Sequence, residues 1–80
     1  MNWNNALSYC QNYRAGMYLP NREQLELIYN YKSTFDLPIT YYWSSTSLDS
    51  NQAYELDFSN GTQSDGTKNG LSYVMCLGEP

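Results

Sequence analysis

Two acidic residues on one predicted strand have a spacing that could support acid-base chemistry. Glu55 and Asp57 are two positions apart, so in an extended strand their carboxyl groups lie about 7 Å from each other on one face. Glycosidases use carboxyl pairs at comparable separations. A general acid, however, needs a raised pKa, and nothing in the sequence indicates that either side chain is desolvated. The sequence also lacks histidine, the usual base for a nucleophile. We therefore predict that the protein is not an enzyme.

The predicted turns concentrate oxygen ligands of the kind that Ca²⁺ prefers. The carboxylates and amides belong to Asp49, Asn51, Asp57, Asn60 and Asp65. No EF-hand spacing is present, and Asp and Asn also gather in turns because their side chains bond to the backbone. Calcium at Asp57, Asn60 and Asp65 is thus one hypothesis and turn formation the other. No further cofactor is expected.

Aromatic side chains are the main candidates for ligand contact. The chain has nine tyrosines and two tryptophans, and a ring with a polar group suits both sugars and protein interfaces. We expect contacts from Tyr18, Tyr41, Tyr42, Trp43 and Tyr54. For Trp43 a competing explanation is simpler: a core ring, with the hydroxyls that follow it satisfying backbone groups of a turn.

Cys10 and Cys76 are predicted to form one disulfide. A chain of 80 residues buries only about 60% of its unfolded surface, and folds of this size commonly need a covalent link. A bridge closing most of the chain contributes about 4 kcal/mol in the loop-entropy model. The alternative is two buried free thiols in a cytosolic protein, because disulfides persist in oxidising compartments. Without histidine or Cys-x-x-Cys, a zinc site is excluded.

The charge distribution excludes several classes of partner. The net charge is −4, and the four basic residues are scattered along the chain. Nucleic acid and anionic membrane surfaces need clustered cations. No apolar stretch approaches the roughly 20 residues that span a bilayer, so direct membrane insertion is not expected. The polar residues after Met1 are unlike a signal peptide, so we expect any export signal to lie outside this sequence.

Two helices are predicted in the first part of the chain. Apolar residues recur at spacings of three and four from Trp3 to Tyr13, with Asn2 as N-cap and Gly16 as the C′ residue. Residues 17–19 must be extended before a proline. A capping box then opens a helix over residues 22–31.

The remaining chain is predicted to form strands. Residues 41–46 are rich in β-favouring types, and residues 52–58 alternate, with Tyr54, Leu56 and Phe58 inward and Ala53, Glu55 and Asp57 outward.

The structure of the later segments is predicted from their residue composition. Asn60-Gly61 favours a tight hairpin, residues 63–70 are polar and read as an exposed loop or frayed hairpin arm, and residues 71–77 are apolar enough for a central strand. Residues 32–40 are predicted to be an irregular connection. The sum is an α+β domain over residues 1–80: two helices followed by an antiparallel sheet of three to four strands.

Several motifs in this order resemble a known family. They are Trp3-x-x-Ala6, Leu19-Pro20-x-Arg22-Glu23, Tyr41 to Thr46, Phe58-Ser-Asn-Gly and Val74-Met75-Cys76. The chain resembles the C-terminal domain family of the Legionella collagen-like protein, found in exported bacterial adhesins and lipoproteins. The resemblance implies a C-type-lectin-like fold, an extracellular, cell-surface or periplasmic location, a homotrimer and an adhesive role.

We do not expect this chain to bind the ligand of that family's founding member. The founding member binds sulfated glycosaminoglycans, which requires concentrated positive charge. The family usually has Trp-Arg where Met17-Tyr18 stand here, and often has Arg where Met75 stands, so two cationic positions are lost. We therefore expect a non-catalytic binding module for a glycan or a surface protein. The alternatives are a structural oligomerisation cap and a receptor-binding domain diversified by a phage or retroelement.

Overall fold

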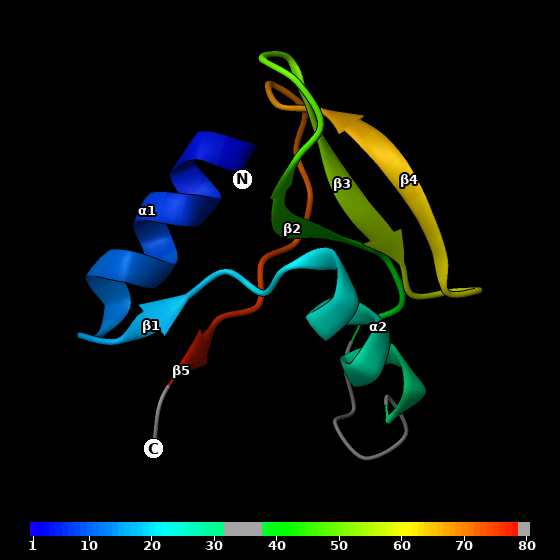
Figure 1. The fold of residues 1–80 in the computed structure, drawn as a ribbon, viewed down its shortest axis with the longest axis horizontal. Coiled ribbons are helices and arrows are strands. Elements are labelled where there is room, and N and C mark those ends of the chain that lie inside the picture. The colour runs from blue at the N-terminus through cyan, green and yellow to red at the C-terminus, as the bar shows by residue number, and fades with distance from the viewer. Residues whose placement is uncertain (32–37, 79–80) are drawn as a thin grey trace.

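The computed structural model describes residues 1–31 and 38–78. It has helices α1 (Trp3–Tyr13) and α2 (Arg22–Asn30), a three-stranded sheet of β2 (Tyr41–Ser47), β3 (Gln52–Asp57) and β4 (Thr62–Thr67), and a two-stranded sheet of β1 (Met17–Tyr18) and β5 (Leu77–Gly78) (Figure 1). The predicted α+β class, with two helices and a small antiparallel sheet, is confirmed. Most of the connection predicted over residues 32–40 lies outside the described residues.

Both predicted helix starts are present. The side chain of Asn2 accepts a hydrogen bond from the Asn5 amide at 2.9 Å. At α2, Asn21 and Gln24 form the reciprocal capping box, with both hydrogen bonds 2.8 Å long. These bonds satisfy amides that the first helical turn leaves without partners, so the local sequence alone fixes where each helix begins.

Gly16 was predicted to end α1 as its C′ residue, and that assignment is wrong. The C-cap is Arg14, two residues earlier. Gly16 instead has a φ of +86° within a turn that the Met17 amide closes on the Arg14 carbonyl at 3.1 Å. Positive φ is easily reached by glycine because it lacks a Cβ. The glycine therefore directs the chain into β1.

The three-stranded sheet is antiparallel in the order β2-β3-β4. Tyr41 pairs with Asp57 and Trp43 with Glu55, and the register then shifts before Ser47. Strands β3 and β4 pair without interruption from Gln52–Thr67 to Asp57–Thr62. Because side chains alternate along a strand, the face that carries Trp43 also carries Tyr41, Glu55 and Asp57.

For residues 63–70, the hairpin-arm alternative is confirmed and the exposed-loop alternative is wrong. This polar stretch contributes most of β4, because pairing with β3 satisfies its backbone groups while its place at the sheet edge keeps polar side chains near water. The central strand predicted over residues 71–77 is wrong. This segment makes one bridge, from Tyr73 to Tyr42, and β5 begins only at Leu77. Leu71 is 81% exposed.

The hairpin after β3 is present, but its loop is longer than a tight two-residue turn. Asp57 pairs with Thr62, which leaves residues 58–61 in the loop. Gly61 has the positive φ, +78°, and the Asn60 side chain accepts a hydrogen bond from the Thr62 amide at 2.9 Å. The asparagine thus stabilises the turn through its side chain.

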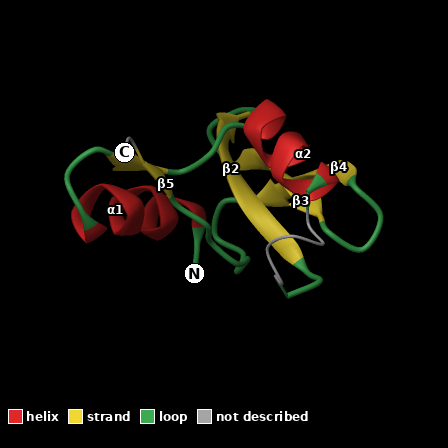
Figure 2. Cartoon of the chain, turned by 90° about the horizontal axis from the view of Figure 1, so that it is seen from below, coloured by secondary structure: helices red, strands yellow, loops and turns green. Residues whose placement is uncertain are grey.

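The core consists of two clusters, one on each face of the three-stranded sheet. Leu25, Tyr42, Leu56 and Phe58 lie together on the α2 side, and Ala6, Cys10, Leu19, Trp43 and Ala53 lie together on the other. The inward positions Leu56 and Phe58 are confirmed. The outward prediction for Ala53 is wrong, since it is fully buried beneath residues of α1. Figure 2 shows α1 and β5 on one side of the molecule and α2 with the larger sheet on the other.

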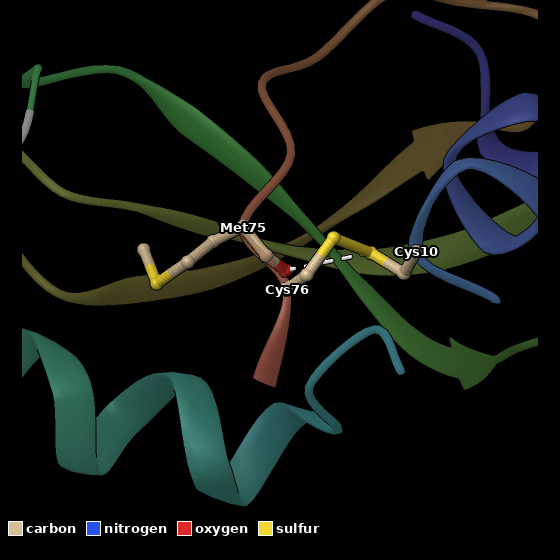
Figure 3. The surroundings of a disulfide bond; sticks show 3 residues. All are labelled: Cys10, Met75 and Cys76. Atoms are coloured by element: carbon tan, nitrogen blue, oxygen red, sulfur yellow. Dashed lines mark hydrogen bonds between the residues drawn. A yellow bond between two sulfur atoms is a disulfide. The ribbon is translucent and has the colours of Figure 1, made fainter. Parts of the chain in front are cut away.

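The predicted disulfide joins Cys10 of α1 to Cys76, with 5.4 Å between their Cα atoms. That distance is typical of disulfides. The Cys10 sulfur also lies 3.9 Å from the Met75 carbonyl oxygen (Figure 3). Since a disulfide sulfur carries no proton, this is a packing contact and not a hydrogen bond. The bond fixes the first helix to the segment that precedes β5.

Candidate functional site

Tyr41 lies at the start of β2. Of the predicted contact residues, it is the one whose ring is exposed at the surface beside a hollow. Its side chain is 44% exposed, and it shares a sheet face with Trp43, Glu55 and Asp57. Trp43, two residues on, is 1% exposed. One face of the sheet therefore offers an exposed ring next to a buried one, with two carboxylates on the neighbouring strand.

The segment 71–73 runs beside β2 and is held there by backbone hydrogen bonds. The Trp43 amide donates to the Tyr73 carbonyl and the Tyr73 amide donates to the Tyr41 carbonyl, both at 3.0 Å. The indole nitrogen of Trp43 donates to the Met1 carbonyl at 2.9 Å, and the Ser72 amide donates to the same oxygen at 3.1 Å. These bonds set the position of exposed apolar side chains that have little packing of their own.

We call the region around these residues the Tyr41 surface. It contains two hollows that share Tyr41, Leu71 and Ser72. The carboxylate hollow, of about 130 Å³, is completed by Trp43, Glu55, Gly66, Thr67 and Gly70. The apolar hollow, of about 180 Å³, is completed by Met1, Thr40 and Tyr73. Around the apolar hollow, Leu71, Tyr73 and Met1 are 81%, 54% and 42% exposed.

Glu55 is the charged residue that lines the carboxylate hollow. Its Oε2 accepts a hydrogen bond from the Ser72 hydroxyl at 2.6 Å. Gly66 on β4 makes room for it, because a Cβ at that position would lie 2.8 Å from the Glu55 carboxyl group and 2.8 Å from Cζ3 of Trp43. The absence of a side chain at Gly66 thus leaves room for the carboxylate near the indole ring, and the Ser72 hydroxyl orients it.

Asp57 lies next to Tyr41 across the strand pair and is tightly hydrogen-bonded. The Ser59 hydroxyl and amide donate to Asp57 Oδ1 at 2.7 and 2.9 Å. These bonds lower the pKa of the Asp57 carboxyl group, and a hydrogen bond from the Tyr41 hydroxyl acts in the same direction. A general acid needs the opposite shift. Asp57 therefore does not fit the role of a general acid.

The other predicted contact residues lie in different places. Tyr42 is 2% exposed and donates its hydroxyl to the Pro38 carbonyl at 2.9 Å; burial raises the pKa of that hydroxyl. Tyr54 is on the opposite sheet face, where the Arg22 guanidinium lies 4.0 Å from its ring centroid. Tyr18 is on β1 and is 36% exposed. The structure brings together Tyr41 and Trp43 at one surface and separates Tyr18 and Tyr54 from it.

The hydroxyl residues after Trp43 stabilise the bulged end of β2. Ser44 is fully buried, donates its hydroxyl to the Tyr54 carbonyl at 2.7 Å and accepts from the Thr46 amide at 3.1 Å. This is the arrangement expected from the core explanation of the segment. Trp43 and Ser44 therefore support the Tyr41 surface from beneath.

Three of the oxygen ligands considered for calcium, those of Asp49, Asp57 and Asn60, accept hydrogen bonds within turns. Asp57 caps Ser59 and Asn60 caps Thr62, as described above, and Asp49 Oδ1 accepts from the Asn51 and Gln52 amides at 2.8 Å each. Asp65 pairs with Tyr54 on the other face. In residues 1–31 and 38–78, no three His, Cys, Asp or Glu side chains are grouped to hold a metal ion.

A third hollow lies beside the disulfide. It has a volume of about 250 Å³ and is lined by Tyr9, Tyr13, Met17, Val74 and Cys76. Tyr9 and Tyr13 are exposed on α1, with ring centroids 5.9 Å apart. It is larger than either hollow of the Tyr41 surface, but its lining has no charged side chain. Ligand sites usually combine apolar walls with a few convergent polar groups, which favours the Tyr41 surface.

Sequence reasoning missed Met1, Leu71, Ser72 and Tyr73. The residue types of 71–77 favour a buried strand, and their exposure depends on a path fixed by distant backbone partners. No local signal in the sequence identifies that path.

Within the described part of the chain, no helix is long and apolar enough to cross a bilayer. A family model described as InvE_AD, an adhesion domain, matches residues 1–77. No curated protein matches this chain.

Proposed function

The chain belongs to the InvE_AD adhesion-domain family, and from that premise we propose that it is a non-catalytic binding module whose ligand-contacting region is the Tyr41 surface. The adhesion-type domain implied by the sequence resemblance is confirmed at this level. The matching family model is not that of the Legionella collagen-like protein. We retain the C-type-lectin-like fold and the homotrimer as proposals, with residues 1–80 acting as one module.

One observation carries the proposal: an exposed aromatic ring stands between two hollows on a backbone held by hydrogen bonds. Binding loses less conformational entropy when the contacting groups are already ordered before the ligand arrives. Here the Trp43 and Tyr73 amides fix the two segments that carry Tyr41 and Leu71. Contiguous exposed apolar side chains on a small domain are also typical of interaction sites.

The absence of catalysis is supported by the electrostatics of the surface. The lowered pKa of Asp57 keeps that group ionised and unable to donate a proton near neutral pH. A polar group in a binding site can still orient a ligand without chemistry. We propose a glycan or a surface protein as the ligand.

We propose that the domain works outside the cytoplasm, at the bacterial surface or in the periplasm. The Cys10–Cys76 disulfide supports this location because disulfides are rare in reducing compartments. An adhesive role requires the same exposure to the outside.

The experiment compares three purified variants on a glycan array and on immobilised extracellular-matrix proteins. Tyr41→Ala and Leu71→Asn change the Tyr41 surface, and Tyr13→Ala changes a ring on α1 that is 63% exposed, more than the 44% of Tyr41. We expect the wild type to bind at least one immobilised ligand, and the first two variants to lose roughly tenfold in affinity, as truncated hot-spot residues do. Tyr13→Ala should bind like the wild type.

Two results would overturn the proposal. One is a uniformly negative screen with protein assembled into its native oligomer, which light scattering would establish first. The other is binding that Tyr13→Ala weakens and Tyr41→Ala leaves unchanged, which would move the contact region to the hollow beside the disulfide.

A further inference from the structure

We propose that the carboxylate hollow receives a lysine or arginine side chain of a protein ligand. This inference rests on the proposed function and names the chemistry of the ligand. It assigns the anchoring role to Glu55 and Tyr41, with the adjoining apolar hollow receiving a neighbouring apolar side chain.

The charge of the hollow favours a cation. Glu55 lines it, and Asp57 lies on the same sheet face. Two basic side chains are engaged elsewhere: the Lys68 ammonium lies 4.1 Å from the Trp3 ring centroid and donates to Ser47 at 2.8 Å, and Arg22 stacks on Tyr54, on the opposite face. The Met1 ammonium lies at the adjoining apolar hollow, where it donates to the Ser72 carbonyl at 3.0 Å. Among the residues that line the carboxylate hollow, Glu55 is the one with a charged side chain, so the hollow suits a cation better than an anionic ligand such as a sulfated glycan.

The Glu55 carboxylate has acceptor capacity left for a ligand. An ionised carboxylate offers about four lone-pair sites. Within residues 1–31 and 38–78, the hydrogen bond from Ser72 to Oε2 is the one that this carboxylate accepts, and no basic side chain forms an ion pair with it. A Cβ at Gly66 would lie 2.8 Å from both this carboxyl group and Cζ3 of Trp43, so these groups are close together, and the hydrogen bond from Ser72 orients the carboxylate before a ligand arrives.

Aromatic rings beside the carboxylate add a second attraction for a cation. Tyr41 and Trp43 both line the hollow, and the face of an aromatic ring attracts ammonium and guanidinium groups. Tyr41 is 44% exposed and lies directly across the strand pair from Asp57. A carboxylate next to an aromatic ring therefore attracts a basic side chain more strongly than it attracts a neutral hydroxyl group.

The size of the hollow favours one side chain over a whole small molecule. Ligand pockets usually enclose about 300–1,000 Å³, whereas this hollow has about 130 Å³. The apolar hollow on the other side of Tyr41 has about 180 Å³. Two small neighbouring hollows of different polarity fit two adjacent side chains of a protein segment.

The test is a titration of the ¹⁵N-labelled domain, followed by NMR, with N-acetyl-arginine amide and N-acetyl-lysine amide. N-acetyl-citrulline amide supplies a neutral control of nearly the same shape, and methyl glucoside a neutral sugar. We expect saturable shifts for the basic probes at the amides of Tyr41, Gly66, Gly70 and Ser72. Binding of citrulline should be roughly tenfold weaker, because a hydrogen bond to a charged group is stronger than a neutral one.

Two variants and a salt series make the result specific. Glu55→Gln should weaken arginine binding roughly tenfold, while Asp65→Asn, on the opposite sheet face, should leave it unchanged. Raising the ionic strength from about 0.02 to about 0.5 M should weaken binding to the wild type, since salt screens exposed charges. The salt series needs no variant, so it decides the matter even if Glu55→Gln fails to fold.

Equal binding of citrulline or of methyl glucoside, insensitivity to salt, or shifts confined to the hollow beside the disulfide would overturn the inference. It fails separately from the proposed function. If Tyr41→Ala abolishes binding to an immobilised ligand while arginine produces no shift at these amides, the adhesive surface stands and the basic anchor does not.

Discussion

Breaking the Cys10–Cys76 disulfide is expected to remove a large part of the free energy of unfolding. The two cysteines are 66 residues apart, and the loop-entropy relation for a loop of that length gives about 4 kcal/mol at 25 °C. At 0.05–0.15 kcal/mol per residue, a domain of 80 residues has a stability of about 4–12 kcal/mol. The crosslink thus supplies between a third and all of it.

Reduction is the cleanest perturbation, because it leaves both sulfur atoms in the protein. Cys10 is fully buried among core residues, so a polar replacement would add a desolvation cost of its own. The matched control is the double variant Cys10→Ala and Cys76→Ala, which lacks the bond and should not respond to the reductant. Its unfolding should resemble that of the reduced wild type, apart from the cost of the lost sulfur atoms.

The assay is urea and thermal denaturation followed by tryptophan fluorescence and circular dichroism. For a domain of this size each kcal/mol corresponds to about 4–8 °C, so the melting temperature should fall by at least about 15 °C on reduction. A fall of less than about 4 °C would refute the reasoning. It would mean that the unfolded chain is already compact enough for the crosslink to add no constraint.

Three further predictions concern single side chains. Gly66→Ala places a methyl group 2.8 Å from Trp43 and Glu55 and should lower the free energy of unfolding by about 1–3 kcal/mol in urea titrations; an unchanged midpoint would contradict the close packing. Asn21→Ala removes the capping box of α2 and should cost about 1 kcal/mol, whereas no loss would mean that tertiary contacts alone fix the helix start. Ser59→Ala should raise the pKa of Asp57, measured by carboxyl ¹³C NMR, because it removes the hydrogen bond from the Ser59 hydroxyl, the largest cause of the lowered pKa, while the bond from the Ser59 amide remains. Since the folded-state pKa is the lower one, Asp57 stabilises the fold above about pH 4, its unfolded value, and the contribution disappears as the pH falls through the folded value; an acid-unfolding curve that is the same in Asp57→Asn would contradict this.

The elements that could be predicted are those whose signals are local. The starts of α1 and α2 depend on side-chain bonds between residues three apart, so the sequence contains the whole interaction. The disulfide was predictable because a chain this short with two cysteines has few other means of stabilisation.

The elements that could not be predicted depend on partners far along the chain. Strand β4 forms because β3 offers a ladder of backbone partners, although its residues are polar. Ala53 is buried because residues of α1 cover its face, which the alternation of its own strand does not reveal.

The residues of the candidate site also fall into those that the sequence predicts and those that it does not. Tyr41 could be identified from its type and from its place at the start of a strand. Leu71 and Tyr73 could not, because their exposure follows from backbone hydrogen bonds to Met1 and to β2. Residue type predicts burial only when the path of the backbone is known.

Residues 74–77 pack against elements from the first part of the chain, and this affects the order in which the domain folds. Val74 and Cys76 pack against the cluster that contains Ala6 and Cys10, and Leu77 completes the small sheet with Tyr18. Contacts of such high sequence separation form late and slowly. When the N-terminal side of the domain emerges first from a ribosome or a translocation pore, its core beside α1 therefore stays incomplete until residues 74–77 have followed, and the disulfide and the small sheet form only then.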